Sequence, residues 1–362
     1  MSRFWSAVVH GLTPYVPGEQ PKLDNLVKLN TNEHPYGPSP RALEAIRAAT
    51  GDGLRLYPDP NADALKAALA KRHGVQPQQI FVGNGSDEVL AHAFMALLKH
   101  DAPILIPDIS YSFYPVYCGL YQVEHVAIPL GERFEIRVDD YLRHAGKCGG
   151  IVIANPNAPT GCLLPLEAIE RMLQASPDSV VVVDEAYIEF RDPGTPTALE
   201  LIGEYENLAV SRTMSKAFAF AGARVGYLAA NKGIIDCVRI VRMPYHLSAV
   251  TQAAALAAFE HTDEQLSRVA HLRETRNATS AWLKEQTYKG QPLEVAETQS
   301  NFILFGGHFD DRDRIFDELL KRGVLIRVVG PEGWMRVCMG TDEEMARFRE
   351  ALVEVLRIVE QG

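Results

Sequence analysis

The sequence predicts an α/β fold: a large domain built on a mostly parallel seven-stranded sheet between helices, followed by a smaller α+β domain. Up to about residue 230, short β-branched runs alternate with longer helical patterns, which is typical of a parallel sheet. Several of these runs are apolar throughout, as expected for strands covered on both faces. The length of 362 residues suits about two domains.

Seven runs predict the strands of the large sheet. They span residues 79–82, 103–106, 123–128, 150–154, 180–183, 208–210 and 225–229. We expect a helix after the first run, because Leu90, Phe94 and Leu97 have helical spacing. Ser86 and Asp87 are expected to cap the start of that helix.

The remaining segments predict an arm and a second domain. Residues 1–30 are rich in proline and are expected to form an N-terminal arm. The large domain is expected to span 31–240, and the small domain, which packs with the arm, 241–362. In that part a long helical stretch begins near Met243 and an amphipathic helix closes the chain. Between them lie strand-like runs at 301–305, 324–329 and 335–339.

Composition and charge exclude several classes of protein. A formal net charge of −10 without a basic run argues against a nucleic-acid partner. No apolar stretch reaches the ~20 residues that span a bilayer, and no secretory signal is evident, so we expect no membrane partner and a cytoplasmic location. The 5 cysteines without a CxxC pair predict reduced thiols, and the 11 histidines without ligand spacing predict no metal site.

Polar clusters directly follow five of the predicted strands. Because the carboxyl ends of strands in an open α/β sheet form one edge where ligands bind, these clusters predict a single site. They lie at 83–87, 108–111, 155–157, 184–187 and 211–216. In the first, the sequence 83–86 opens a helix, so free N–H groups there can hold an anion such as phosphate. The alternative interpretation is an ordinary strand-to-helix turn, which would also need glycines such as Gly83 and Gly85.

Three of these residues suggest cofactor chemistry. Asp184 follows four valines, and a buried carboxylate needs a partner such as a cationic heterocycle nitrogen, unless it caps a helix or forms a structural salt bridge. Lys216 has small apolar neighbours and Arg224 eight residues on, a setting that lowers a lysine pKa for Schiff-base formation; most lysines are simply solvated. Asn157 is placed to donate to a cofactor oxygen or to stabilise its turn.

Together the motifs resemble those of the fold-type I PLP-dependent aminotransferases. These motifs are GNGSDE (83–88), NPNAPTG (155–161), DEAYIEF (184–190) and TMSKAFAFAGARVGY (213–227). Further segments resemble the histidinol-phosphate aminotransferases within that group, over residues 12 to 355 or so. They are LTPYVPGEQP (12–21), LNTNEHPYGPSP (29–40), LYPDP (56–60) and MRVCMGT (335–341).

The resemblance implies pyridoxal 5'-phosphate (PLP) as cofactor. Lys216 would form the internal aldimine and move the substrate proton, and Asp184 would keep the pyridinium nitrogen protonated. Asn157 and Tyr187 would hold the ring 3-oxygen, and Tyr111 would stack on the ring. The residues implied near the cofactor phosphate are Gly85, Ser86, Asp87, Thr213, Ser215 and Arg224, and Tyr57 of a neighbouring subunit in a homodimer. The negative charge of Asp87 there has no simple explanation from the sequence.

The resemblance also implies the substrates. Arg336 would bind the carboxylate of L-glutamate, Arg327 would help bind the substrate phosphate, and Tyr15 and Asn32 would close over the substrate. The reaction would be a ping-pong transamination between L-histidinol phosphate / imidazole acetol phosphate and L-glutamate / 2-oxoglutarate in L-histidine biosynthesis.

Three alternatives remain open at this stage. Aromatic amino-acid aminotransferases and threonine-phosphate decarboxylases share the PLP motifs, and the aromatic stretch 111–117 could line an aromatic side-chain pocket or pack at the domain edge. A non-catalytic protein of the same fold is disfavoured because Lys216 and Asp184 are both present.

Overall fold

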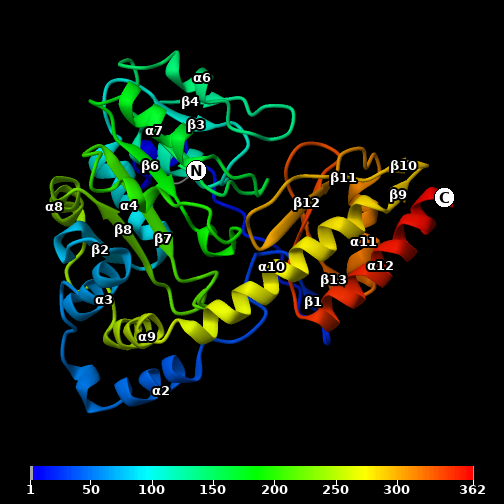
Figure 1. Cartoon of the computed structure of the whole chain (residues 1–362), viewed down its shortest axis with the longest axis horizontal. Helices are drawn as coiled ribbons and strands as arrows, with labels where there is room; N and C mark the ends of the chain where they lie inside the picture. Colours follow the sequence, from blue (N-terminus) through cyan, green and yellow to red (C-terminus); the bar gives the residue numbers. More distant parts are fainter. Residues whose placement is uncertain (1–2, 362) are drawn as a thin grey trace.

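The computed structural model describes residues 3–361. Two lobes are visible, one around a seven-stranded sheet and one around a four-stranded sheet (Figure 1). The larger sheet has the strand order β2-β8-β7-β6-β5-β3-β4. Its strands are β2 (Ile80–Gly83), β3 (Ile104–Pro107), β4 (His125–Ile128), β5 (Gly150–Ala154), β6 (Val181–Asp184), β7 (Leu208–Thr213) and β8 (Gly226–Ala230). The predicted fold class and all seven predicted strands are confirmed.

One strand departs from the parallel arrangement. β8 runs antiparallel to both of its neighbours, β2 and β7, whereas the other pairings are parallel. The connection 214–225 therefore leaves the carboxyl end of β7 and re-enters the sheet at the same edge. This brings Lys216 and Arg224, both within the connection, to the edge where the parallel strands end.

Helices cover both faces of the large sheet (Figure 1). Val181 and Val183 of β6 belong to one apolar cluster, while Val182 between them belongs to the other. This two-sided burial explains the uninterrupted valine run. The helices of this lobe are α2 (Pro40–Ala49), α3 (Asp63–His73), α4 (Gly85–Leu97), α5 (Tyr114–Tyr121), α6 (Val138–Leu142), α7 (Leu166–Ala175), α8 (Lys232–Val241) and α9 (Ala249–Glu260).

The start of α4 corrects one expectation. The N-cap residue is Asn84, whose backbone N–H donates to the Glu88 carboxylate at 2.7 Å. Ser86 and Asp87 lie within the first turn, so the prediction that they cap the helix is wrong. Because Glu88 takes that role, their polar side chains are free to face the pocket described below.

The second lobe contains an antiparallel sheet of order β11-β12-β15-β14. The predicted run 324–329 is split, because β13 pairs with β1 whereas β14 joins this sheet. The pairing of β1 with β13 ties the N-terminal segment to this lobe. The elements of this lobe are β1 (Val27–Lys28), α10 (Asp263–Lys284), β9 (Thr287–Tyr288), β10 (Gln291–Pro292), β11 (Glu294–Val295), β12 (Phe302–Gly306), α11 (Arg312–Lys321), β13 (Val324–Leu325), β14 (Arg327–Val328), β15 (Met335–Cys338) and α12 (Asp342–Gln361). The short helix α1 (Ala7–His10) precedes Leu12, which lies against Gly119 of α5 in the first lobe.

The expected arm, residues 1–30, begins with Met1 and Ser2, which lie outside the described residues. From residue 3 to residue 26 its only helix or strand is the short α1. Within residues 3–361, a helix with the length and apolarity to cross a membrane is absent.

Candidate active site

A pocket of about 130 Å³ lies at the carboxyl edge of the large sheet. The predicted cofactor residues that line it are Ser86, Asp87, Tyr111, Asp184, Tyr187, Thr213, Ser215, Lys216 and Arg224. They come from the start of α4, from the loop before α5 and from the segments after β6 and β7. The sheet topology thus brings residues from distant parts of the sequence to one place.

Asp184 occupies the end of β6 and is 5% exposed. Its Oδ2 accepts a hydrogen bond of 3.1 Å from the Tyr114 hydroxyl, whereas Oδ1 is buried with no hydrogen-bond partner in the described part of the chain. Burial raises the pKa of Asp184 to about 7, and the hydrogen bond from Tyr114 opposes that rise. An unpartnered buried carboxylate oxygen fits a cationic ring nitrogen, the group that PLP would present.

Lys216 follows β7 and reaches into the same pocket. Its Nζ donates to the backbone oxygen of Thr31 at 3.2 Å and lies 5.7 Å from the centre of the Tyr187 ring. The Tyr187 hydroxyl in turn accepts a hydrogen bond of 3.0 Å from Asn32 Nδ2. The segment around residue 32 therefore closes one side of the pocket, beside the amine.

The opposite end of the pocket suits an anion. The first turn of α4, a helix of 13 residues, offers backbone N–H groups beside the hydroxyls of Ser86, Thr213 and Ser215. Gly85 has φ +79°, and a Cβ there would lie 2.6 Å from Arg224 Nη2. The positive φ favours glycine, and its missing side chain lets the guanidinium lie against the helix start. The helix N–H groups, the hydroxyls and this cation together fit the cofactor phosphate.

Asp87 has two partners at this end. One carboxylate oxygen accepts from Arg224 Nη2 at 2.7 Å and the other from the Tyr111 hydroxyl at 2.9 Å. The charge that the sequence left unexplained thus holds the predicted phosphate-binding arginine and the predicted stacking tyrosine in place.

Three predicted cofactor residues do not line the pocket: Gly85, which lies behind Arg224, Asn157 and Tyr57. The Asn157 amide donates to the backbone oxygen of Ile109 and to Thr160 Oγ1, and its oxygen accepts from Ser110. Binding a ring oxygen would require Asn157 to give up one of its donated bonds. Tyr57 is 79% exposed and stacks on Tyr245, with ring centres 4.4 Å apart.

The predicted substrate residues lie around β15. Arg336 is a cross-strand partner of Arg327; its Nη2 donates to the backbone oxygen of Asn30 at 2.9 Å, and its buried Nε has no partner within residues 3–361. Asn32, next to Tyr187, is 2% exposed and its Oδ1 is likewise unpartnered among those residues. Tyr15 packs edge-on against Phe113 at 5.1 Å.

Arg327 lines a neighbouring cavity of about 420 Å³, together with the acidic residues Glu19, Asp313 and Asp317. The two predicted substrate arginines thus lie opposite each other on β14 and β15: Arg327 lines this cavity, and Arg336 is hydrogen-bonded to Asn30 near the catalytic pocket.

Sequence reasoning missed Tyr114 as a partner of Asp184. The available signal was the aromatic stretch 111–117, interpreted as a possible substrate pocket or domain edge. Tyr114 and Tyr117 are instead buried in the core beside α4. The buried ion pair between Glu185 and Arg212, 2.7 Å apart, was also missed; it joins the ends of β6 and β7, the strands that lead to Asp184 and Lys216.

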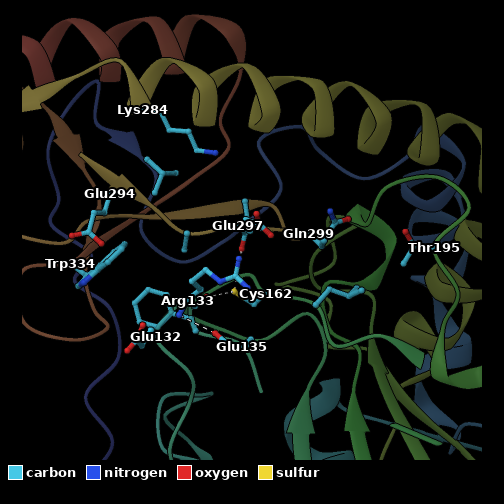
Figure 2. Close-up of a pocket in the computed structure, with 15 residues that line it drawn as sticks. Glu132, Arg133, Glu135, Cys162, Thr195, Lys284, Glu294, Glu297, Gln299 and Trp334 are labelled. Carbon is cyan, nitrogen blue, oxygen red and sulfur yellow. Dashed lines mark hydrogen bonds between the residues drawn. The ribbon is translucent and has the colours of Figure 1, made fainter. Parts of the chain in front are cut away.

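A larger cavity of about 490 Å³ lies elsewhere, between the loop 132–135, the segment 294–299 and Trp334 (Figure 2). None of the predicted site residues lines it. The Cys162 thiol in its wall lies within hydrogen-bond distance of the backbone oxygens of Arg133 and Glu297, at 3.5 and 3.4 Å. Its charged lining consists of four glutamates with Arg133 and Lys284, without the aspartate and the helix start of the smaller pocket.

Comparisons with known proteins agree with this geometry. Residues 24–352 match the model of aminotransferase class I and II. Histidinol-phosphate aminotransferase of Bifidobacterium adolescentis is 64% identical over 96% of this chain and 94% of that protein. Its counterpart in Aromatoleum aromaticum is 50% identical over 99% and 100% of the two chains.

Among solved structures, histidinol-phosphate aminotransferase from Sinorhizobium meliloti in complex with pyridoxal-5'-phosphate superposes with a TM-score of 0.89. It is 26% identical and covers 99% of both chains. The match of the class I and II model to most of the chain, with relatives above half identity, leads to one conclusion: this chain belongs to the class I and II aminotransferases, in the histidinol-phosphate aminotransferase family.

Proposed function

We propose that this protein is a PLP-dependent transaminase of L-histidine biosynthesis. It exchanges the amino group between L-histidinol phosphate / imidazole acetol phosphate and L-glutamate / 2-oxoglutarate in a ping-pong reaction. The observation that carries this is one pocket holding Lys216, the unpartnered Oδ1 of Asp184 and an anion site at the start of α4. A relative at 64% identity with this activity in its name supports the substrate.

When bound, PLP supplies an electron sink that stabilises the charge left when the substrate Cα loses its proton. Asp184 would hold the proton on the ring nitrogen through Oδ1. Lys216 Nζ would provide the amine that attaches the cofactor and would accept and return the substrate proton. Arg224 and the first turn of α4 would bind the phosphate, Tyr111 would pack on the ring, and Tyr187 and Asn157 would hold the ring oxygen.

The substrate groups meet residues of the second lobe. Arg336 is half-buried, and its buried Nε, which has no partner within residues 3–361, can join a forked pair with a carboxylate. Arg327 supplies a second cation for the phosphate ester. Asn32 contacts Tyr187 and Tyr15 contacts Phe113, so both lie where they can cover a substrate. In this scheme the domain 31–240 carries the cofactor residues and Asn32, whereas the arm 1–30 carries Tyr15 and the domain 241–362 carries the two arginines.

We also propose a homodimer. Tyr57 stacks on Tyr245 next to exposed apolar side chains at Leu54, Leu56 and Met243. Such a patch suits a protein interface, and a second copy seated on it would bring Tyr57 toward the partner's phosphate site. The five cysteines are free thiols, which suits a reducing compartment such as the cytoplasm.

A single-turnover absorbance experiment on the PLP form tests the substrate. L-histidinol phosphate, L-phenylalanine and L-threonine phosphate would be compared at equal concentration. We expect L-histidinol phosphate alone to bleach the cofactor absorbance rapidly. Equal or faster bleaching by phenylalanine would reassign the substrate to aromatic amino acids, and absence of PLP from the purified protein would overturn the reaction itself.

A further inference from the structure

Tyr114 is the first residue of α5 and has 0% exposure. Its ring lies 6.3 Å from that of Phe94 and 5.5 Å, edge-on, from that of Tyr111. Burial and the neighbouring Asp184 carboxylate raise the pKa of Tyr114 well above its usual value. The hydroxyl therefore keeps its proton and donates it to Asp184 Oδ2.

The backbone N–H of Ala186 also favours the ionised form of Asp184, but among the described residues Tyr114 is the side chain that donates to this carboxylate. Ala154 of β5 and Ser211 of β7 flank it in the sheet. The carboxylates of Asp87 on α4 and Glu185 on the same strand end both raise the pKa of Asp184. Tyr117, also on α5, donates to the backbone oxygen of Asp87 and not to Asp184. The remaining charged groups of the pocket are the cations Lys216 and Arg224.

We propose that Tyr114 is a positioning residue for the reaction. Its hydroxyl occupies Oδ2 of Asp184, fixes the carboxylate so that Oδ1 faces the pocket, and favours the ionised form that the ring nitrogen requires. This inference rests on the proposed function, because it assigns a partner to the aspartate that binds the cofactor. A neutral hydroxyl suits Oδ2, because a cation there would compete with the ring nitrogen for the negative charge of the Asp184 carboxylate.

The test is PLP binding by the apoprotein, measured by fluorescence titration across a pH series. Tyr114→Phe removes only the donor, so we expect PLP affinity to fall roughly tenfold, the lower end for a hydrogen bond to a charged group. The loss of affinity at acid pH should also begin at a higher pH. Tyr117→Phe is the matched control: it removes another buried hydroxyl of α5 but not the bond to Asp184, and should change affinity less than about twofold.

A double-mutant cycle isolates the coupling. In an Asp184→Asn background, Tyr114→Phe should have little further effect on PLP affinity, because the charge that the hydroxyl serves is gone. Additive effects of the two substitutions would overturn the proposal, as would equal losses in the Tyr114 and Tyr117 variants. Thermal unfolding of each apoprotein separates a folding defect from a binding defect.

If Tyr114→Phe does not fold, 3-fluorotyrosine at position 114 provides a second test, in which PLP affinity is expected to rise instead of fall. Its more acidic hydroxyl donates more strongly and should tighten PLP binding, and unchanged or weaker binding would overturn the inference. The failure of the proposed function looks different, because the unsubstituted apoprotein would then not bind PLP at all.

Discussion

Arg224 and Asp87 form an ion pair at the start of α4, with Nη2 2.7 Å from Oδ2. Both side chains are nearly half exposed, at 45% and 47%, so water screens the pair and its contribution to stability is small. Its effect on binding is larger, because the same guanidinium is the cation we expect at the cofactor phosphate. An incoming anion has to share Arg224 with Asp87.

Asp87→Asn should therefore bind inorganic phosphate more tightly than the unsubstituted apoprotein. The substitution removes a nearby negative charge and frees Arg224, for an expected gain of several-fold, or about 0.5–1 kcal/mol for a half-exposed pair. The measurement is phosphate-dependent thermal stabilisation of the apoprotein. Arg224→Gln, the opposite control, should weaken phosphate binding. Weaker binding by Asp87→Asn would show that holding Arg224 and Tyr111 in place outweighs the charge of Asp87.

The strands and the strand-end site were predictable because each depends on local sequence. The run 180–183 is apolar at every position, which identifies a strand covered on both faces, and Asp184 follows it directly. Polar residues at the carboxyl ends of parallel strands must meet at one edge. The pocket accordingly contains most of the predicted cofactor residues.

The side-chain partners were not predictable, because they depend on packing between distant segments. Tyr114 reaches Asp184 across 70 positions of sequence and Asn32 reaches Tyr187 across 155. The Glu88 carboxylate accepts from the Asn84 backbone N–H only in the side-chain rotamer that it adopts. The sequence does not show that rotamer, so Ser86 and Asp87 were predicted as caps instead. The run 324–329 looked like one strand because its break at Ile326, where the chain passes from one sheet to another, leaves no mark in the hydrophobic pattern.

Lys216→Ala should abolish the covalent attachment of the cofactor and nearly all transamination. Lys216 lines the pocket beside Tyr187, and alanine leaves no amine there to bond the cofactor or move the proton. Borohydride reduction followed by peptide mapping should label Lys216 in the unsubstituted protein. Lys99→Ala serves as the control, because this lysine binds the backbone oxygen of Tyr121. A label on any lysine other than Lys216 would refute the assignment.

Arg336→Lys should raise KM for L-glutamate roughly tenfold or more, on the scale of a hydrogen bond to a charged group. Lysine keeps a positive charge but lacks the planar fork that binds both oxygens of a carboxylate. Steady-state kinetics with varied glutamate measure the change. Arg347→Lys is the matched control, since this arginine donates to the backbone oxygen of Asn25. An unchanged KM for Arg336→Lys would place the carboxylate elsewhere.

His73 should make the apoprotein less stable in acid. Burial and the nearby Arg212 and Arg72 lower its pKa from 6.5 to about 3. Between these values the unfolded chain binds a proton that the folded chain does not, so the free energy of unfolding falls as pH falls through this window.

His73→Gln removes the titrating ring but can still bond the Tyr227 hydroxyl, the partner of His73 at 2.8 Å. We expect its melting temperature to fall less steeply below pH 6.5 than that of the unsubstituted apoprotein, as measured by calorimetry. His125→Gln, exposed on β4, should leave the acid slope as it is. Parallel slopes for the His73 variant and the unsubstituted protein would contradict the prediction.

Asp184 should make the apoprotein less stable as pH rises, which is the opposite of the effect of His73. Burial raises its pKa from 3.8 to about 7, so in that window the folded apoprotein holds a proton that the unfolded chain has released. The free energy of unfolding must then decrease as pH rises from 3.8 toward 7, by at most about 1.4 kcal/mol per pH unit. Asp184→Asn removes this loss, so the apoprotein of the variant should gain relative stability as pH rises.

Addition of PLP should reverse the order of the two proteins. A cationic ring nitrogen beside Oδ1 compensates the buried charge, whereas the neutral amide of asparagine offers no such pairing. Calorimetry of apoprotein and PLP-bound protein over the same pH range should show the variant more stable without PLP near pH 7 and less stable with it. If Asp184→Asn were less stable in both forms, Asp184 would be a structural residue, and the unpartnered oxygen in the pocket would need another explanation.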